Sequence, residues 1–446
     1  MQFYVTEFGA KPNDNELQTK YFQNALDYCF LHGGGEVVVP EGKYIIGEIR
    51  VRSNTTLKLL KNSSLVGSKN ADDYKLLSGK DEIEPMPSEF LPTVYRAKER
   101  DEFYKNWYNG LILIYRAKDV AIIGEEGAVI NGSNVYNPNG EEGYRGPHCI
   151  TVLESENLSF KGYTIKDSAN WAHCMWLCKN IICENVSVLA GHDGIDFFGS
   201  DNVKIRKCFL HTGDDCIAGY DNVDVDISDC ELNSSCSAMR FAGTNVVIQN
   251  CKVFGPGEFI HRYSLSLEEK ARGANANPKQ LNKYRNNMLS FMTYYADMRL
   301  KVRNEPKNIL ITNCKILNCD RFLHFNYSGN EIWQKQTPLR EITFRNITAK
   351  NVKLPLNLYG DENKPISLTM QNCVIDFDDT ALDNPIVNAA NFNKIELINV
   401  NTNADYPAAI DCYSKKAGEI MIDGGNVAER FKTTIEHKTQ FKTQSI

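Results

Sequence analysis

The sequence predicts an all-β chain wound as a single parallel β-helix. Three observations favour this fold class: a repeat of about 22 residues, short alternating runs of Val and Ile within each copy, and Asn, Asp or Gly between the runs. A repeat of this length is typical of a solenoid. Alternating β-branched residues bounded by turn residues indicate strands rather than helices. The L-x-x-L-x-L frame of leucine-rich repeats is absent, so stacked β-coils are expected.

The repeat is clearest in the middle of the chain. Four successive copies read KNIICENVSV, SDNVKIRKCFL, YDNVDVDISDCEL and GTNVVIQNCKV. Their Asn residues are 22, 20 and 23 residues apart and are Asn180, Asn202, Asn222 and Asn245. Asn adopts the left-handed conformation more readily than most residues, and its side chain can hydrogen-bond to backbone or to another Asn. We therefore expect a structural column of Asn residues along the stack.

The N-terminal segment, about residues 1–40, is predicted to cap the stack. An amphipathic pattern over about residues 15–31 predicts a helix that ends at Gly33-Gly34-Gly35, before the strand EVVVP. A first coil without a cap would expose an apolar end and unpaired strand edges. The whole chain, residues 1–446, is then expected to form one β-helix domain behind this cap.

Two stretches interrupt the repeat, at about residues 70–110 and 256–305. The first is rich in Glu, Pro, Lys and aromatic residues, and the second shows no strand period. Long insertions in a solenoid often line a binding face, although an interface or a lid would give the same pattern.

Composition and charge exclude several classes of protein. The 446 residues are 42% hydrophobic and 24% charged, which is typical of globular proteins rather than disordered or fibrous ones. The net charge of −6 argues against nucleic acid as the main partner. No apolar run approaches the roughly 18–20 residues of a membrane-spanning helix. The N-terminus shows no leader pattern, so a cytoplasmic location is expected unless a leader was removed.

The fourteen cysteines are too dilute for a disulfide scaffold. Cys208, Cys230 and Cys251 recur at intervals of 22 and 21 residues, which predicts a stacked interior column of small apolar side chains. Cys174 and Cys178 form a C-x3-C pair without a second pair at a zinc-site interval, so no metal site is expected there. Free thiols fit a reducing compartment.

Three carboxylates are expected to meet near the middle of the stack. The segments GHDGIDFFGS and HTGDDCIAGY place Asp193 and Asp215 22 residues apart, which is one coil, with Asp214 adjacent. Like charges that close repel, so at least one pKa should rise, as suits a proton donor. An acid beside a carboxylate can cleave a glycosidic bond. An ordinary turn or a calcium site would use the same residues, and spacing alone leaves both open.

The segment HDGIDFFGSDNVKIRKCFLHTGDDCIAGY resembles the signature of the polygalacturonases, glycoside hydrolase family 28. That family typically shows Asn-Thr-Asp-Gly, then Gly/Gln-Asp-Asp-Cys about one coil later, then Gly-His-Gly. The segments EFGAKPNDNELQ, HGGGEVVVPEGKYIIGEI, WYNGLILIYRAKDVAIIGEEGAVINGS, SANW and LREITFRNITAKNV are also similar, so the resemblance covers about residues 5–400. It implies a single-stranded, right-handed, pectin-lyase-like β-helix that acts on an oligosaccharide. No cofactor and no metal is predicted.

By this resemblance, Asp214 would be the general acid, and Asp193 and Asp215 would hold and deprotonate the attacking water, with inversion at the anomeric carbon. Stacked neighbours lie about 5 Å apart, near the range usual for retaining enzymes, so the residues by themselves leave the stereochemistry open.

The chain departs from the family pattern in three places. Asn-Thr-Asp is replaced by Gly191-His192-Asp193, and Gly-His-Gly falls on Ser235-Cys236-Ser237. The Arg-x-Lys pair that holds a galacturonate carboxylate in the family has no clear counterpart. The substrate-binding site is therefore expected to use other residues.

Five residues are candidates for substrate binding: His192, Arg240, His261, Arg262 and Trp171. An arginine one coil beyond the aspartates could pair with a carboxylate, and a histidine beside a catalytic aspartate could tune its protonation or contact a sugar hydroxyl. The tryptophan, with His173 and Trp176, could form a sugar-stacking platform. Surface charge, turn capping and ordinary packing are the alternatives for these residues.

Three functions remain open. The first is a glycosidase acting on pectin-derived or related oligosaccharides, with α-galacturonide-type linkages and exo action, since the long inserts could block one end of a groove. The second is a β-helix polysaccharide lyase or a fructan-converting glycosyl transferase. The third is a non-catalytic carbohydrate-binding β-helix. The oligomeric state is not predicted.

Overall fold

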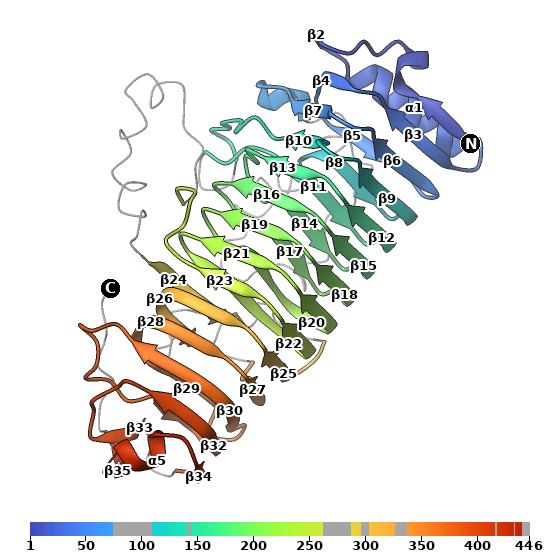
Figure 1. Cartoon of the computed structure of the whole chain (residues 1–446). Coiled ribbons are helices and arrows are strands. Elements are labelled where there is room, and N and C mark those ends of the chain that lie inside the picture. The colour runs from blue at the N-terminus through green and yellow to red at the C-terminus, as the bar shows by residue number, and fades with distance from the viewer. Residues whose placement is uncertain are drawn as a thin grey trace.

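The computed structural model describes residues 1–74, 109–140, 144–261, 287–295, 303–325, 337–414, 417–431 and 433–438. The described chain is a parallel β-helix whose coils stack in sequence order, from α1 at one end to β34 and β35 at the other (Figure 1). This confirms the predicted fold class. Most of the two predicted inserts lies outside the described residues.

The strands form three columns, and each strand pairs in parallel with strands of the neighbouring coils. The first column contains β1 Gln2–Tyr4, β3 Gly35–Val39, β6 Thr55–Leu59, β9 Lys118–Gly124, β12 Glu156–Lys161, β15 Lys179–Glu184, β18 Asp201–Arg206, β20 Ile217–Ser228, β22 Ser237–Gln249, β25 Lys307–Thr312, β27 Glu341–Arg345, β30 Ile366–Phe377, β32 Phe392–Thr402 and β34 Glu419–Asp423. The second column contains β2 Asp14–Leu17, β4 Gly42–Ile46, β7 Ser63–Gly67, β10 Val129–Asn131, β13 Thr164–Lys166, β16 Ser187–Ala190, β19 Phe209–Thr212, β21 Glu231–Ser234, β23 Lys252–Phe254, β26 Lys315–His324 and β28 Thr348–Leu354.

The third column carries the candidate site. It contains β5 Ile49–Val51, β8 Gly110–Tyr115, β11 His148–Leu153, β14 His173–Trp176, β17 Ile195–Phe198 and β24 Met288–Tyr294, together with parts of β20, β22 and β26. A separate sheet near the C-terminus contains β29 Leu356–Tyr359, β31 Val387–Ala390, β33 Ala408–Cys412 and β35 Thr433–His437.

Strand β24 lies inside the stretch that the sequence predicts to be an insert, so its strand period is missed. All but one of its seven residues are buried, which removes the alternation between buried and exposed side chains that marks a half-buried strand. The strand pairs with β22 and β26 and continues the third column.

A helix, α1 Thr19–Leu31, forms within the predicted N-terminal segment. Its buried side chains include Phe22, Ala25, Leu26 and Cys29, and it packs against β3 and β5. The apolar spacing of three and four residues explains why this face turns inward. Its role as a cap stays a prediction. Three short helices complete the described elements: η1 Val5–Phe8, η2 Ala71–Tyr74 and α5 Val427–Arg430. In the described part of the chain, no helix has the length and apolar character to span a bilayer.

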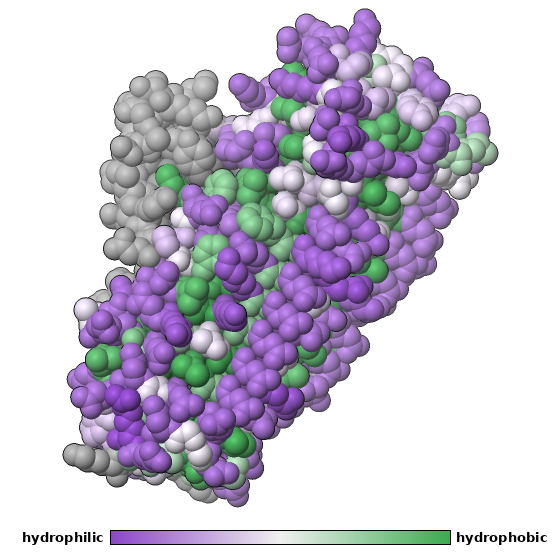
Figure 2. All heavy atoms as spheres, viewed as in Figure 1, coloured by the Kyte–Doolittle hydropathy of each residue, from purple (hydrophilic) through white to green (hydrophobic). Residues whose placement is uncertain are grey.

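The Asn column forms a hydrogen-bonded ladder. Asn180 donates from Nδ2 to Asn157 Oδ1 at 2.9 Å, and Asn202 donates to Asn180 at 2.8 Å. Asn180, Asn202 and Asn245 have φ near 55°, as predicted for left-handed positions. Asn180 lies on β15, Asn202 on β18 and Asn245 on β22, and Figure 2 shows a largely hydrophilic surface where β9, β12, β15 and β18 lie in Figure 1.

Asn222 does not belong to this ladder, so that part of the prediction is wrong. The register places Asp224 opposite Asn202, and Asn245 donates to Asp224 Oδ1 at 2.9 Å. Asn222 instead donates to the carbonyl oxygen of Phe197 at 2.8 Å. The coil therefore repeats after 22 residues, with Asp in place of Asn.

The predicted cysteine column is confirmed. Cys208, Cys230 and Cys251 are buried and are followed in the next coil by Cys314, which is also buried. All fourteen cysteines are free thiols. The column therefore fills the interior between β-coils, and the reducing compartment stays a prediction.

Candidate active site

The predicted stacking of three aspartates is confirmed. Asp193 and Asp215 each lie two residues before a third-column strand, and the register pairs Ile195 of β17 with Ile217 of β20. The backbone N–H of Asp215 donates to Asp193 Oδ1 at 2.9 Å. Asp193, Asp214 and Asp215 each have a carboxylate oxygen within 4.8 Å of the others. The β-helix register therefore gathers the three groups at one point.

The cluster holds a proton more tightly than ordinary carboxyl groups do. Asp193, Asp214 and Asp215 are only 6%, 5% and 2% exposed. Burial, followed by the charges of Asp214 and Asp215, raises the pKa of Asp193 well above its usual range. The nearby Arg145 and the amide of Asp215 oppose this shift. Because the groups interact strongly, the retained proton belongs to the cluster rather than to one residue.

Arg145 was not predicted from the sequence and is a buried cation that faces two of the three aspartates. It is 3% exposed, with Nη2 3.6 Å from Asp214 Oδ2 and Nη1 4.0 Å from Asp193 Oδ2. Nη1 also donates to Asn170 Oδ1 at 3.1 Å, which fixes the side chain. Its segment lies between β10 and β11 and belongs to no repeat, so no periodicity indicates where it packs.

His261 reaches the candidate acid from outside the repeat. Its Nε2 lies 2.8 Å from Asp214 Oδ2, and its side chain is 12% exposed. The sequence predicts a substrate contact here, whereas the structure brings the imidazole to the catalytic candidate itself. Arg262, the other candidate in this segment, lies outside the described residues.

Arg240 also joins the cluster. It lies on β22, and its Nη1 is 4.0 Å from Asp215 Oδ2. The guanidinium lies 4.1 Å from the centroid of the Tyr295 ring, a cation–π arrangement that orients it. With a side chain 30% exposed, Arg240 retains surface that a ligand could contact.

A fourth buried carboxylate, Asp196, was also missed. It is fully buried on β17, and neither side-chain oxygen has a hydrogen-bond partner among the described residues. Burial, then the charges of Asp193, Asp215 and Asp214, raises its pKa well above the usual range, against the opposing charge of Arg240. The signal was a lone charged residue in the otherwise apolar strand segment IDFF.

The two remaining candidates lie among packed rings. His192 is fully buried with its ring centroid 6.3 Å from that of Tyr144, so its contact with a sugar stays a prediction. Trp171 is half-buried and stacks on Phe198 at 5.5 Å. His173 and Trp176, the two residues proposed to join Trp171 in a sugar-stacking platform, are both buried and packed against other rings. His173 is buried beside the hydroxyl of Tyr163, and burial lowers its pKa to about 4, while Trp176 stacks on Phe198.

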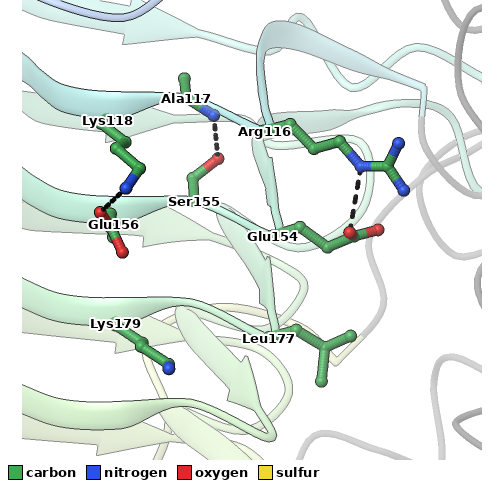
Figure 3. Close-up of a pocket in the computed structure, with 8 residues that line it drawn as sticks. All are labelled: Arg116, Ala117, Lys118, Glu154, Ser155, Glu156, Leu177 and Lys179. Atoms are coloured by element: carbon green, nitrogen blue, oxygen red, sulfur yellow. Dashed lines mark hydrogen bonds and ion pairs between the residues drawn. The ribbon is translucent and has the colours of Figure 1, made fainter.

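A separate hollow of about 430 Å³ lies at the carboxyl ends of β8, β11 and β14 (Figure 3). Arg116 pairs with Glu154 at 3.1 Å, and Lys118 pairs with Glu156. The aspartates precede the amino ends of β17 and β20, so this hollow lies at the other edge of the column. Two of the cations that line this hollow, Arg116 and Lys118, already pair with Glu154 and Glu156. The aspartate cluster, in contrast, brings together the carboxyl groups that acid–base catalysis requires.

One known protein family matches the part of the chain that contains the three aspartates. The family described as glycosyl hydrolases family 28 matches residues 36–253, a range that includes the three aspartates, Arg145 and Arg240 and ends before His261.

Among sequence relatives, a probable polygalacturonase of Vitis vinifera is 26% identical over 48% of this chain and 43% of the relative. An exo-poly-alpha-D-galacturonosidase of Dickeya chrysanthemi is 24% identical over 48% of this chain and 41% of the relative. The chain thus matches less than half the length of either relative.

Solved structures share the fold. A hyperthermoactive exopolygalacturonase of Thermotoga maritima has a TM-score of 0.60 at 16% identity, covering 84% of this chain and 87% of that one. The surface adhesin PfbA of Streptococcus pneumoniae has a TM-score of 0.55 at 14% identity, covering 98% and 100%. At these identities the likeness extends to the β-helix alone.

Proposed function

We propose that this chain, which belongs to the polygalacturonase-like family 28 of the glycosyl hydrolases, hydrolyses α-galacturonide-type linkages in pectin-derived oligosaccharides. The observation that carries this proposal is the meeting of Asp193, Asp214 and Asp215 in one buried cluster that retains a proton. A proton donor beside a carboxylate is the arrangement that glycosidic hydrolysis requires.

In the proposed reaction, Asp214 gives its proton to the glycosidic oxygen as the bond to the anomeric carbon breaks. Asp193 or Asp215 accepts a proton from water as the water oxygen bonds to that carbon. Arg145, 3.6 Å from Asp214, stabilises the carboxylate that the acid leaves behind. The low exposure of the cluster strengthens these electrostatic interactions because little water competes for them.

Inversion is proposed from family membership rather than from the spacing. Carboxylate oxygens within 4.8 Å of one another lie closer than the roughly 6.5–9.5 Å usual between the two carboxyl groups of inverting enzymes. Proton NMR of the first anomer released tests this point directly. Release of the inverted anomer supports the proposal, and release of the retained anomer overturns it.

Arg240 is proposed to hold the substrate carboxylate in place of the family's Arg-x-Lys pair. Its partly exposed guanidinium beside Asp215 supports this role. Arginine can bind a carboxylate through two parallel hydrogen bonds, which lysine cannot reproduce. Arg240→Lys should therefore raise KM for oligogalacturonides more than for their methyl esters. An equal effect on both would contradict the assignment.

Exo action is the finer proposal, supported by the name of the Dickeya relative. Products from a defined oligogalacturonide, sampled early, should contain the terminal product and a substrate shortened by it. An early ladder of intermediate sizes would instead indicate internal cleavage.

The same assay distinguishes the two other functions. An unsaturated product absorbing in the near ultraviolet, with activity lost on adding chelator, would indicate a lyase. Binding of oligosaccharide without any product would indicate a carbohydrate-binding β-helix. A cytoplasmic location remains a proposal that cell fractionation tests.

A further inference from the structure

Three different metal-binding side chains converge beside the aspartate cluster. A carboxylate oxygen of Asp214, Sγ of Cys236 and a ring nitrogen of His261 lie within 4.8 Å of one another. Cys236 follows Asp214 by 22 residues, which is one coil, so the thiol stacks on the candidate acid. His261 completes the group from the segment after β23.

Cys236 differs from every other cysteine of the chain. The remaining thirteen are buried, and Cys236 alone is half-buried. Its backbone N–H donates to Ser234 Oγ at 2.7 Å, which fixes the turn between β21 and β22. The other thirteen thiols are enclosed in the interior, whereas this one reaches partly exposed surface beside an acid and an imidazole.

We propose that Asp214, Cys236 and His261 form a binding site for a thiophilic divalent ion of the zinc class. Thiolate, imidazole and carboxylate are the three protein ligands that zinc accepts, commonly with a fourth position open to water. Calcium and magnesium prefer oxygen ligands and would gain little from the sulfur and nitrogen. Asp193 and Asp215, within 4.8 Å of Asp214, offset the positive charge of the nearby Arg145 and Arg240, which would otherwise repel a cation.

For one of the three ligand pairs, the present distance is close to the one that an ion would require. His261 Nε2 and Asp214 Oδ2 are 2.8 Å apart. Two such ligands on one tetrahedral zinc, each about 2.0–2.1 Å from the metal, are separated by about 3.3 Å. Binding would release the thiol proton of Cys236, and any proton that His261 carries, to solvent.

Occupancy would remove Asp214 from proton donation, so the ion would act as a reversible inhibitor. This consequence depends on the proposed glycosidase function, whereas ion binding does not. The two can therefore fail separately.

Titration with cobalt(II) tests the binding claim without any substrate. Cobalt bound to a thiolate gives a charge-transfer band in the near ultraviolet, which zinc then abolishes by displacement. We expect one such site per chain in the wild type, loss of the band in Cys236→Ser, and at least tenfold weaker cobalt binding in His261→Gln. Cys208→Ser, a buried cysteine of the interior column, is the matched control and should keep the band.

A second measurement covers the case in which a variant folds poorly. In the folded wild type, a thiol reagent should modify Cys236 first, and zinc should slow this modification at least tenfold. Absence of the cobalt band in wild type, its survival in Cys236→Ser, or equal modification rates with and without zinc would each overturn the proposal. If activity is found, zinc should inhibit wild type more strongly than Cys236→Ser, and chelator should restore it.

Discussion

Two stacks of like residues in this molecule have opposite energetic character. Along the outer turns, Asn180, Asn202 and Asn308 each donate to an Asn of the preceding coil at 2.8–3.0 Å. In the candidate site, Asp193 and Asp215 are stacked with the same one-coil spacing. An Asn amide both donates and accepts hydrogen bonds, so stacked Asn side chains can bond to one another. An ionised carboxylate only accepts hydrogen bonds, so stacked Asp side chains repel one another.

The carboxylate stack is consequently supported by residues that do not repeat. Arg145, Arg240 and His261 come from a loop, a neighbouring strand and a segment beyond the repeat, and each lies within 4.0 Å of a cluster oxygen. The Asn column, whose side chains hydrogen-bond to one another, stabilises the fold. A stack of carboxylates that repel one another destabilises the fold. Such stacks are common in active sites, where strongly shifted pKa values serve catalysis.

The largest expected effect comes from removing the candidate acid. Asp214→Asn should lower turnover of oligogalacturonides about 10²–10⁴-fold, because an amide cannot donate the proton that the leaving oxygen needs. The matched control is Asp224→Asn in the Asn ladder, which removes one charge but keeps the oxygen that accepts from Asn245. Reducing-sugar release should be unchanged in that control. An equal loss in both variants would contradict the division between the two stacks.

Removal of the buried cation should produce the next largest effect. Arg145→Met leaves Asp193 and Asp214 without their shared partner, and breaking a buried ion pair costs about 3–5 kcal/mol of unfolding free energy. Urea denaturation measures this loss. Arg116→Met, which breaks an exposed pair with Glu154, should cost about 1 kcal/mol or less. Similar losses in the two variants would show that the cluster does not depend on Arg145.

Asp196→Asn should raise the free energy of unfolding, in contrast to Arg145→Met. The pKa of Asp196 is raised in the folded protein, so the folded state binds its proton more tightly than the unfolded state does. Wild-type stability therefore falls as pH rises above the unfolded pKa of about 3.9, and the neutral variant avoids that loss. We expect a gain of about 1–3 kcal/mol at neutral pH that disappears below about pH 4. Thermal unfolding across this range measures it, and a constant difference at all pH values would exclude the charge explanation.

The smallest effect should come from one rung of the ladder. Asn202→Ala loses the hydrogen bond to Asn180 and places alanine at φ 54°, which should cost about 1–2 kcal/mol. Asn202→Gly loses the same bond but tolerates the conformation, so it should be less destabilising than alanine. Chemical denaturation of both variants separates the two contributions. Activity should be unaffected, and a fall in turnover would mean that the ladder also serves the site.

The repeating features could be predicted from the sequence because a repeat carries its own register. Counting 22 residues was enough to bring Asp193 over Asp215 and to place the cysteine column. Asn222 was misassigned because the assignment followed the residue type: 22 residues beyond Asn202 lies Asp224, which takes the same left-handed position and accepts the same hydrogen bond. Residue identity alone did not distinguish the two.

The partners of the carboxylates could not be predicted because loops fix their positions. Nothing in the neighbourhood of Arg145 repeats, so its contact with Asp214 follows only from three-dimensional packing. His261 was selected as a candidate, but its target was unknown until the segment after β23 was placed. Asp196 was overlooked because its strand gives the buried-run pattern, in which one polar residue carries no periodic signal.

Carbon-13 NMR titration of the aspartate side-chain carboxyl groups tests the central claim most directly, because it observes proton retention by the stacked carboxylates themselves. In an Asp196→Asn background, which removes the other carboxyl group with a raised pKa, we predict a resonance that titrates well above the usual pH of about 3.9. It should disappear when Asp193→Asn is added and persist when Asp224→Asn is added instead. If every aspartate titrates in the usual range, or if the raised resonance survives unchanged when Asp193→Asn is added to the Asp196→Asn background, the stack does not hold the proton on which the proposed hydrolysis depends.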